Sequence, residues 1–117
     1  MRLFNGNQAL SRDGLLELYG MKVFTEFLRF KTEMLDNKPE LIFSNAYQIN
    51  CYIELYECLL QLGEELNSNE LRHAISIKDL FDHVYEAWNL ECKWDSNDLY
   101  GFCRMLMQKE SKKKEVA

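Results

Sequence analysis

The sequence predicts an all-α fold, a compact bundle of about four to five helices around a long central helix. Apolar residues recur at alternating spacings of three and four positions, which is the periodicity of one side of an α-helix. Proline occurs once and glycine five times in 117 residues, so we expect few turns and long helices. Hydrophobic residues make up 47% of the chain, enough for one core, and a single domain over residues 1–117 is expected.

The first 36 residues predict a short arm followed by a long helix. Asn5-Gly6 is a favoured hairpin turn, so residues 1–10 are expected to form an extended arm or a small hairpin. Ser11 or Asp13 can cap a helix that runs to about Asp36. Its apolar row contains Leu16, Gly20, Val23, Phe27, Phe30 and Met34, while Lys22, Glu26, Arg29 and Glu33 are expected to face solvent. Glycine on the apolar row permits the close approach of another backbone, or else weakens the helix by about 1 kcal/mol relative to alanine.

Residues 39–66 are expected to form the central helix. A short link containing Pro39 precedes it, so the first two helices should form an antiparallel hairpin. Two neighbouring apolar rows make a wide stripe that other helices can cover from two directions. The first row contains Ile42, Ala46, Ile49, Ile53, Tyr56 and Leu60, the second contains Tyr52, Leu55, Leu59, Leu62 and Leu66, and Asn50, Glu54, Glu57, Gln61 and Glu64 lie opposite.

Three shorter helices are expected after the central one. Asn67 and Glu70 have the spacing of a capping box, and a helix with Leu71, Ala74 and Ile75 should follow. The next helix should start near Asp79 and present an apolar side that ends in Trp88, which closes the core. The last should start at Asp95 or Ser96, with Leu99, Phe102, Cys103 and Leu106 inward, and residues 108–117 are expected to form a flexible basic tail.

The cysteines and the hydropathy predict a cytoplasmic protein. Cys51, Cys58, Cys92 and Cys103 include no C-x-x-C pair, and reduced thiols are expected. No apolar run approaches the roughly 20 residues that cross a bilayer, so no membrane contact is expected. The first residues also lack the apolar core of a secretion signal.

Patterns typical of enzymes are absent from the sequence, and a non-enzymatic protein without cofactor or metal is expected. There is no glycine-rich phosphate loop, and the two histidines have no local partner that marks a general base. One alternative stays open. His83 lies four residues after Asp79 and three before Glu86, which is compatible with a metal-dependent hydrolase.

Charge is distributed unevenly along the chain. Residues 39–98 contain three Lys/Arg against twelve Asp/Glu, a balance of −9, whereas residues 1–38 balance to +1 and residues 99–117 to +3. An acidic surface of this kind repels phosphate and attracts basic surfaces. Direct binding of nucleic acid is therefore not expected.

Part of the sequence resembles a known protein family, and this resemblance implies a genetic setting for the protein. Glu17-Leu18-Tyr19, the long helix, and the stretch PELIFSNAY at residues 39–47 resemble a family of small uncharacterised proteins from phages, plasmids and conjugative elements of Gram-positive bacteria. Asp79-Leu80-Phe81 and Trp88 resemble a later segment of that family. The likeness covers about residues 15–90 and brings no catalytic residues with it. It implies a mobile element in a bacterial host.

The leading hypothesis is therefore an inhibitor, of the anti-CRISPR type, that blocks a host defence nuclease by occupying its basic nucleic-acid-binding surface. The partner would be a host protein, CRISPR-associated or another nuclease that binds nucleic acid. The alternative is a homodimeric accessory or regulatory module of the mobile element, because Phe43, Tyr47, Tyr100 and Met107 lie off the main apolar rows. The residues expected to bind the nuclease are Asp79, Asp82, Glu86, Glu91, Trp94, Asp95 and Asp98.

Overall fold

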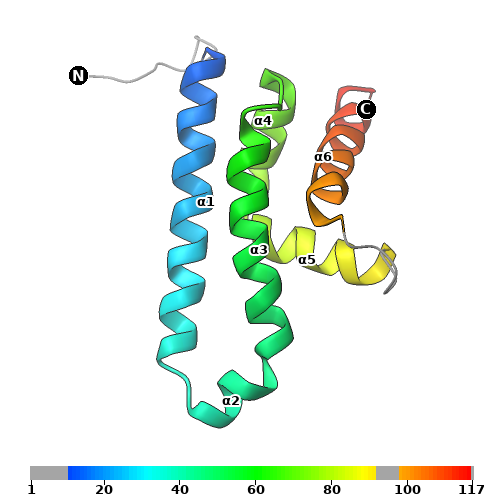
Figure 1. Ribbon diagram of the computed structural model, residues 1–117. Coiled ribbons are helices and arrows are strands. Elements are labelled where there is room, and N and C mark those ends of the chain that lie inside the picture. Colours follow the sequence, from blue (N-terminus) through cyan, green and yellow to red (C-terminus); the bar gives the residue numbers. More distant parts are fainter. Residues whose placement is uncertain (1–10, 92–97, 117) are drawn as a thin grey trace, which may run out of the picture.

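A computed structural model describes residues 11–91 and 98–116, with side chains for 11–90 and 98–113 (Figure 1). These residues form helices and no strand, which confirms the all-α class. The predicted arm at residues 1–10, together with Cys92, Trp94, Asp95 and Ser96, lies outside the described residues. The helices are α1 (Arg12–Leu35), α2 (Pro39–Ser44), α3 (Ala46–Gly63), α4 (Ser68–Ser76), α5 (Leu80–Glu91) and α6 (Leu99–Val116).

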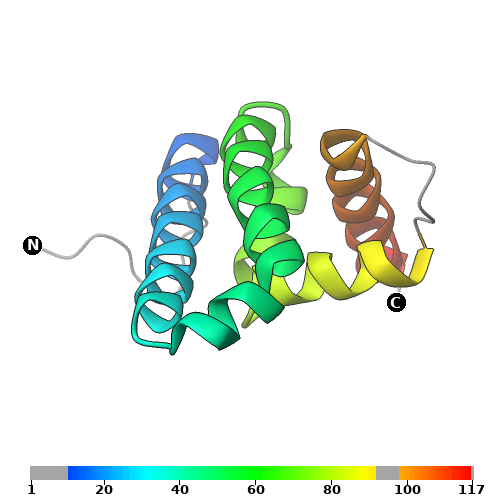
Figure 2. The same cartoon turned by 60° about the horizontal axis from the view of Figure 1, so that its bottom comes forward.

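The predicted hairpin of long helices forms the front of the molecule. α1 and α3 run antiparallel and side by side, joined at their far end by the short α2 (Figure 1). α4 packs behind them against α1 and α6, and α6 also packs along α3. α5 crosses the others at a steep angle (Figure 2). α4 and α5 therefore lie behind the α1–α3 pair, and α6 flanks α3 on the side away from α1.

The central helix is shorter than residues 39–66, because the chain bends at Asn45. Its backbone leaves the helical region, with φ −102° and ψ 16°, and separates α2 from α3. The hydroxyl of Ser44 donates to the carbonyl of Leu41 at 3.0 Å. Serine and asparagine compete in this way with the regular helical hydrogen bonds. The apolar periodicity runs through the bend and does not reveal it.

The core contains one of the two apolar rows expected on residues 39–66. All five members of the second row, from Tyr52 to Leu66, are buried. The expectation that the first row is also covered was wrong, since Ile53 remains 45% exposed and Leu60 is exposed as well. Phe81 and Tyr85 of α5 pack against Tyr52 of the second row. Tyr56 of the first row stacks instead on Phe27 of α1.

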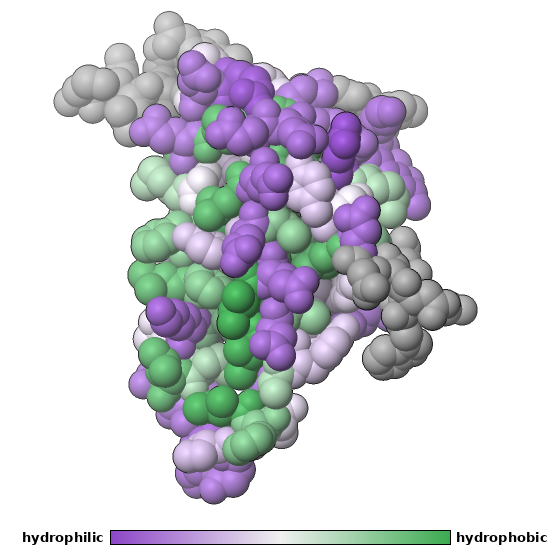
Figure 3. All heavy atoms as spheres, in the orientation of Figure 1, coloured by the Kyte–Doolittle hydropathy of each residue, from purple (hydrophilic) through white to green (hydrophobic). Residues whose placement is uncertain are grey.

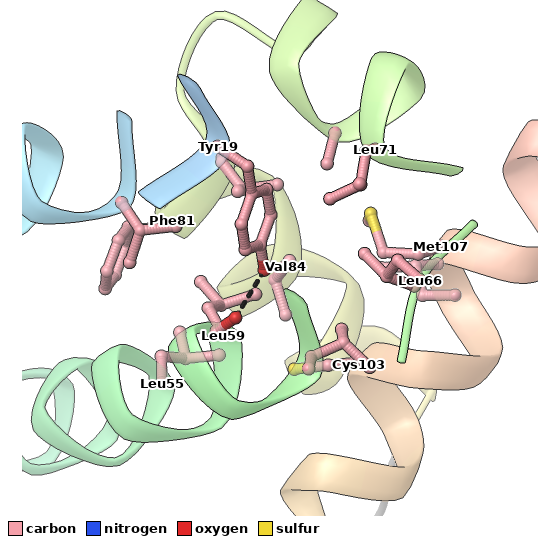
Figure 4. Packing of buried hydrophobic residues seen from close by; sticks show 14 of the residues in the cluster. Tyr19, Leu55, Leu59, Leu66, Leu71, Phe81, Val84, Cys103 and Met107 are labelled. Carbon is pink, nitrogen blue, oxygen red and sulfur yellow. Dashed lines mark hydrogen bonds between the residues drawn. The ribbon is translucent and has the colours of Figure 1, made fainter. Parts of the chain in front are cut away.

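Tyr19 fixes the spacing between α1 and α3. It is fully buried, and its hydroxyl donates to the carbonyl of Leu59 at 2.6 Å (Figure 4). A Cβ on Gly63 would lie 2.9 Å from Cε2 of the Tyr19 ring. The glycine that permits close helix packing is therefore Gly63, whereas a Cβ on Gly20 would meet nothing within 4 Å.

Two charged side chains of α1 bind the ends of other helices. Arg12 donates to the carbonyls of Gly63, Glu64 and Leu66 at 2.7–3.1 Å, so a cation sits at the C-terminus of α3. Glu26, expected at the surface, is instead buried. Its carboxylate accepts from the backbone N–H groups of Leu80 and Phe81 at 3.1 and 3.0 Å, and thereby caps α5.

α4 and α5 begin close to the predicted positions, whereas α6 begins at Leu99 and not at Asp95 or Ser96 as expected. Asn67 and Glu70 form both hydrogen bonds of the capping box, at 2.8 and 2.9 Å. Asp98 caps α6 by accepting from the N–H of Gly101 at 2.8 Å. The segment 108–117, expected as a flexible tail, continues α6 to Val116. Glu110 lies within this segment and accepts hydrogen bonds from side chains of α4 and α5, which holds the last turns in place.

Paired glycine substitutions test the spacing of α1 and α3. Gly63→Ala should lower the free energy of unfolding by about 1–3 kcal/mol, because the buried Tyr19 ring has no room to move away. Gly20→Ala should raise it by up to about 1 kcal/mol, because the added methyl group meets no atom of the chain. Urea denaturation followed by circular dichroism measures both. Equal effects would contradict this packing.

The carboxylate of Glu26 provides a second test. Glu26→Ala should cost about 2 kcal/mol, because two N–H groups at the start of α5 lose their acceptor. Glu33→Ala removes an exposed carboxylate from the same helix and should stay within about 0.5 kcal/mol. The midpoints of thermal unfolding compare the two variants. A Glu26→Ala variant as stable as Glu33→Ala would exclude a capping role.

Candidate functional site

An open apolar groove of about 320 Å³ lies between the end of α1, α2 and the start of α3. α2 closes one end of it, because the bend at Asn45 turns Ile42 toward α1. Lys31 is the charged residue on its wall. The other lining residues are Phe27, Phe30, Met34, Leu35, Ile42, Ile49 and Ile53.

Stacked aromatic rings form the floor of the groove. Phe27 of α1 stacks on Tyr56 of α3 with ring centroids 4.4 Å apart. The ring centroids of Phe30 and Tyr52 lie 4.2 Å apart. Phe81 of α5 packs against both pairs from behind. Aromatic pairs at these distances contribute beyond their buried area. The groove is therefore a preformed feature of the fold.

The groove belongs to a wider apolar face on α1, α2 and α3. Figure 3 shows hydrophobic residues gathered over the lower parts of these helices. Phe43 is 84% exposed and Tyr47 is also exposed, as expected from their positions off the main rows, whereas Met107 is buried. Apolar surface of this extent on a small protein usually marks an interaction site. The other exposed members are Met21, Phe24, Leu28, Leu35, Leu41, Ile53 and Leu60.

An acidic ridge borders this face on α3. We define it as Glu54, Glu57 and Glu64, which are all exposed. Glu57 lies one helical turn after Ile53, so the ridge begins directly beside the groove wall. Figure 3 shows a hydrophilic band along α3 next to the hydrophobic area. A ligand in the groove would therefore have carboxylates along one side.

The thiol of Cys58 lies close to carboxylates of the acidic ridge. Partial burial raises its pKa, and the nearby carboxylates of Glu54, Glu57 and Asp98 raise it further. Asp98 comes from the start of α6, so carboxylates of two helices converge here. Burial and these carboxylates together keep the thiol protonated. Among the described residues, Cys51, Cys58 and Cys103 form no disulfide.

Two of the acidic residues predicted to bind a partner are engaged within the chain. Asp79 forms an ion pair with Arg29 at 3.1 Å. Asp82 accepts a hydrogen bond from the hydroxyl of Tyr52, whose pKa is raised by burial and by this contact. Both carboxylates therefore connect α5 to the α1–α3 pair.

The structure describes the side chains of two of the remaining predicted residues, Glu86 and Asp98. Glu86 is exposed in the middle of α5, and Asp98 caps α6. Glu91 is the last residue of α5, and its side chain, like Trp94 and Asp95, is not among those described. Trp88, expected to close the core, packs edge-on against Phe102 with centroids 5.4 Å apart. The surface contact expected from these residues stays a prediction.

His73, His83 and Glu110 form a polar cluster where α4, α5 and α6 meet. Both Nε2 atoms lie 2.9 Å from oxygens of Glu110. His83 therefore contacts Glu110 of α6. Asp79, which the metal-dependent hydrolase hypothesis paired with His83, forms an ion pair with Arg29 instead. Among the described residues, no group of three or more His, Cys, Asp or Glu is placed to hold a metal ion. The cluster connects three helices.

Sequence reasoning missed the apolar groove. Its lining residues were assigned to the core because their spacing marks an apolar helix side, and spacing does not tell whether that side is covered. The exposed pair Phe43 and Tyr47 was the one signal that pointed toward surplus apolar surface.

Comparison with family models, curated proteins and solved structures found no match for this chain. In the described part of the chain, no helix has the length and hydropathy needed to cross a membrane.

Removing one wall of the groove should reduce its affinity for apolar ligands. Ile53→Ser should lower the fluorescence of the dye ANS bound to the folded protein, because the side chain lines the groove. Its cost in stability should be only about 1 kcal/mol, since Ile53 is 45% exposed. Leu90→Ser, at an 82% exposed position on α5, is the matched control and should leave the dye signal unchanged.

Proposed function

We propose that this protein acts by binding another protein, with the apolar groove and the acidic ridge as its contact surface. The observation that carries the proposal is the position of the two features side by side on α3. An amphipathic helix has a matching arrangement, with apolar side chains along one side and charged side chains beside them. A partner helix that carries Lys or Arg next to its apolar row would satisfy both features.

The dimensions of the groove suit such a partner. A volume of about 320 Å³ accommodates a few apolar side chains rather than a whole peptide. Hot spots of protein interfaces are anchors of this kind, surrounded by polar contacts that exclude water. The exposed apolar residues around the groove supply the surrounding contact area. The groove would give affinity, and the ridge would select basic partners.

The more specific proposal is an inhibitor of a host defence nuclease, of the anti-CRISPR type. It is supported by the balance of −9 over residues 39–98 and by the mobile-element setting that the resemblance implies. Nucleases that bind DNA or RNA carry basic surfaces, and an acidic protein on such a surface would exclude the substrate. The carboxylates of the ridge are better placed for this contact than Asp79 and Asp82, which bond within the chain.

The experiment compares partner capture by matched variants. Tagged protein is used to purify partners from a lysate of a Gram-positive host, and bound proteins are quantified by mass spectrometry. Ile53→Asp places a charge in the groove, and Glu54→Lys with Glu57→Lys and Glu64→Lys reverses the ridge. Both should reduce capture of a basic, nucleic-acid-binding protein about ten-fold or more, at about 1.4 kcal/mol for each factor of ten.

Controls separate specific binding from general charge effects. Glu17→Lys with Glu33→Lys and Glu40→Lys changes net charge equally away from the ridge and should leave capture unchanged. Binding should weaken with salt, because screening shortens electrostatic reach to about 8 Å at physiological ionic strength. If the groove and ridge variants retain every partner, the proposed surface is wrong. If the partner retains nuclease activity in the complex, the inhibitor role is wrong.

A further inference from the structure

A row of exposed side chains runs along the side of α1 that no other described helix covers. Glu17, Met21, Phe24, Leu28 and Lys31 follow one another at spacings of 4, 3, 4 and 3. This heptad spacing is typical of helices that pair with another helix. All five are exposed, and Phe24 at the centre is 52% exposed. The row is thus an apolar seam with a carboxylate at one end and an ammonium group at the other.

We propose that α1 pairs antiparallel with α1 of a second copy of this chain, about a two-fold axis at Phe24. Glu17 and Lys31 each lie seven residues from Phe24, so the axis brings Glu17 of one copy opposite Lys31 of the other, twice. Met21 of one copy then lies within one residue of the level of Leu28 of the other, close enough for contact, and the two Phe24 rings meet on the axis. An isologous contact must be self-complementary, and this row is so in both charge and hydrophobicity.

The charges distinguish this register from the alternatives. A parallel pair would place Glu17 beside Glu17 and Lys31 beside Lys31, and like charges across a helix pair are unfavourable. An antiparallel pair shifted by half a heptad would place Glu17 opposite Leu35 and Lys31 opposite Met21, which leaves all four charges without counter-charges. The seam spans residues 17–31, and its two ends lie roughly 21 Å apart at 1.5 Å per residue.

The residues beside the seam leave room for a second helix. Apart from the adjacent residues and the nearby backbone of α1, a Cβ on Gly20 would meet no atom of the chain within 4 Å, so the space next to Phe24 is open to a partner side chain. Thr25 and Thr32 border the other side with uncharged groups. The nearby cations Lys22 and Arg29 bind Glu26 and Asp79 within the chain. Of the five seam residues, only Lys31 at one end also lines the groove, so the two surfaces can be tested separately.

Sedimentation equilibrium of the full chain tests the proposal by mass. Wild-type protein should move from 13.9 kDa toward twice that mass between about 1 and 100 μM, as expected for a contact smaller than a standard interface. Phe24→Asp should abolish association, because it places two carboxylates on the axis. Leu90→Asp, on α5, and Ile53→Asp, in the groove, should leave the association unchanged.

Charge exchange tests the register. Glu17→Lys alone and Lys31→Glu alone should each weaken association at least ten-fold, because each creates two like-charge contacts. An equimolar mixture of these two variants should associate as wild type does, since every contact across the axis is again between opposite charges. Monomer at 100 μM, a dimer that survives Phe24→Asp, or a mixture as weak as its components would each overturn the proposal. A dimer lost in Ile53→Asp but kept in Phe24→Asp would place the contact at the groove instead.

Discussion

The contact of Tyr19 with α3 is the constraint on which the rest of the structure depends. The ring lies on Gly63 where a Cβ has no room, and its hydroxyl donates to the carbonyl of Leu59 (Figure 4). Burial raises the pKa of this hydroxyl, so it stays protonated and keeps donating. With α1 and α3 held at this spacing, Arg12 reaches the end of α3 and Glu26 reaches the start of α5. One helix thus positions two others through both packing and hydrogen bonds.

The same arrangement explains why so much apolar surface is exposed. α4 and α5 pack behind the α1–α3 pair and α6 flanks α3 on the side away from α1, which leaves the front of the pair to solvent (Figures 1 and 2). The apolar groove, the acidic ridge beside it and the seam on α1 all lie on that side. Each has the chemistry of a protein contact, and together they support a role in binding. Because the groove and the seam consist of largely different residues, the groove can bind a partner protein while the seam binds a second copy of the chain.

Charged residues divide into those that build the fold and those that face outward. Glu26, Asp79, Asp82, Asp98 and Glu110 each bond to a helix end or to a side chain of another helix. A count of acidic residues therefore overestimates the acidic surface. Carboxylates at helix N-termini and between helices form hydrogen bonds or ion pairs within the protein and stabilise the fold. Burial is the main cause of the raised pKa of Cys58, and the exposed carboxylates Glu54 and Glu57 of α3 raise it further.

The sequence by itself determined the all-α class, the order of the helices, the capping box at Asn67 and the buried row from Tyr52 to Leu66. Those features depend on local spacing and on contacts between residues a few positions apart. Only the tertiary structure decided which apolar rows are covered, where Glu26 and Glu110 bond, and that Gly63 rather than Gly20 is the point of close approach. Each of these depends on partners about 25 to 55 positions away, and periodicity along one helix holds no information about the side from which its neighbours arrive.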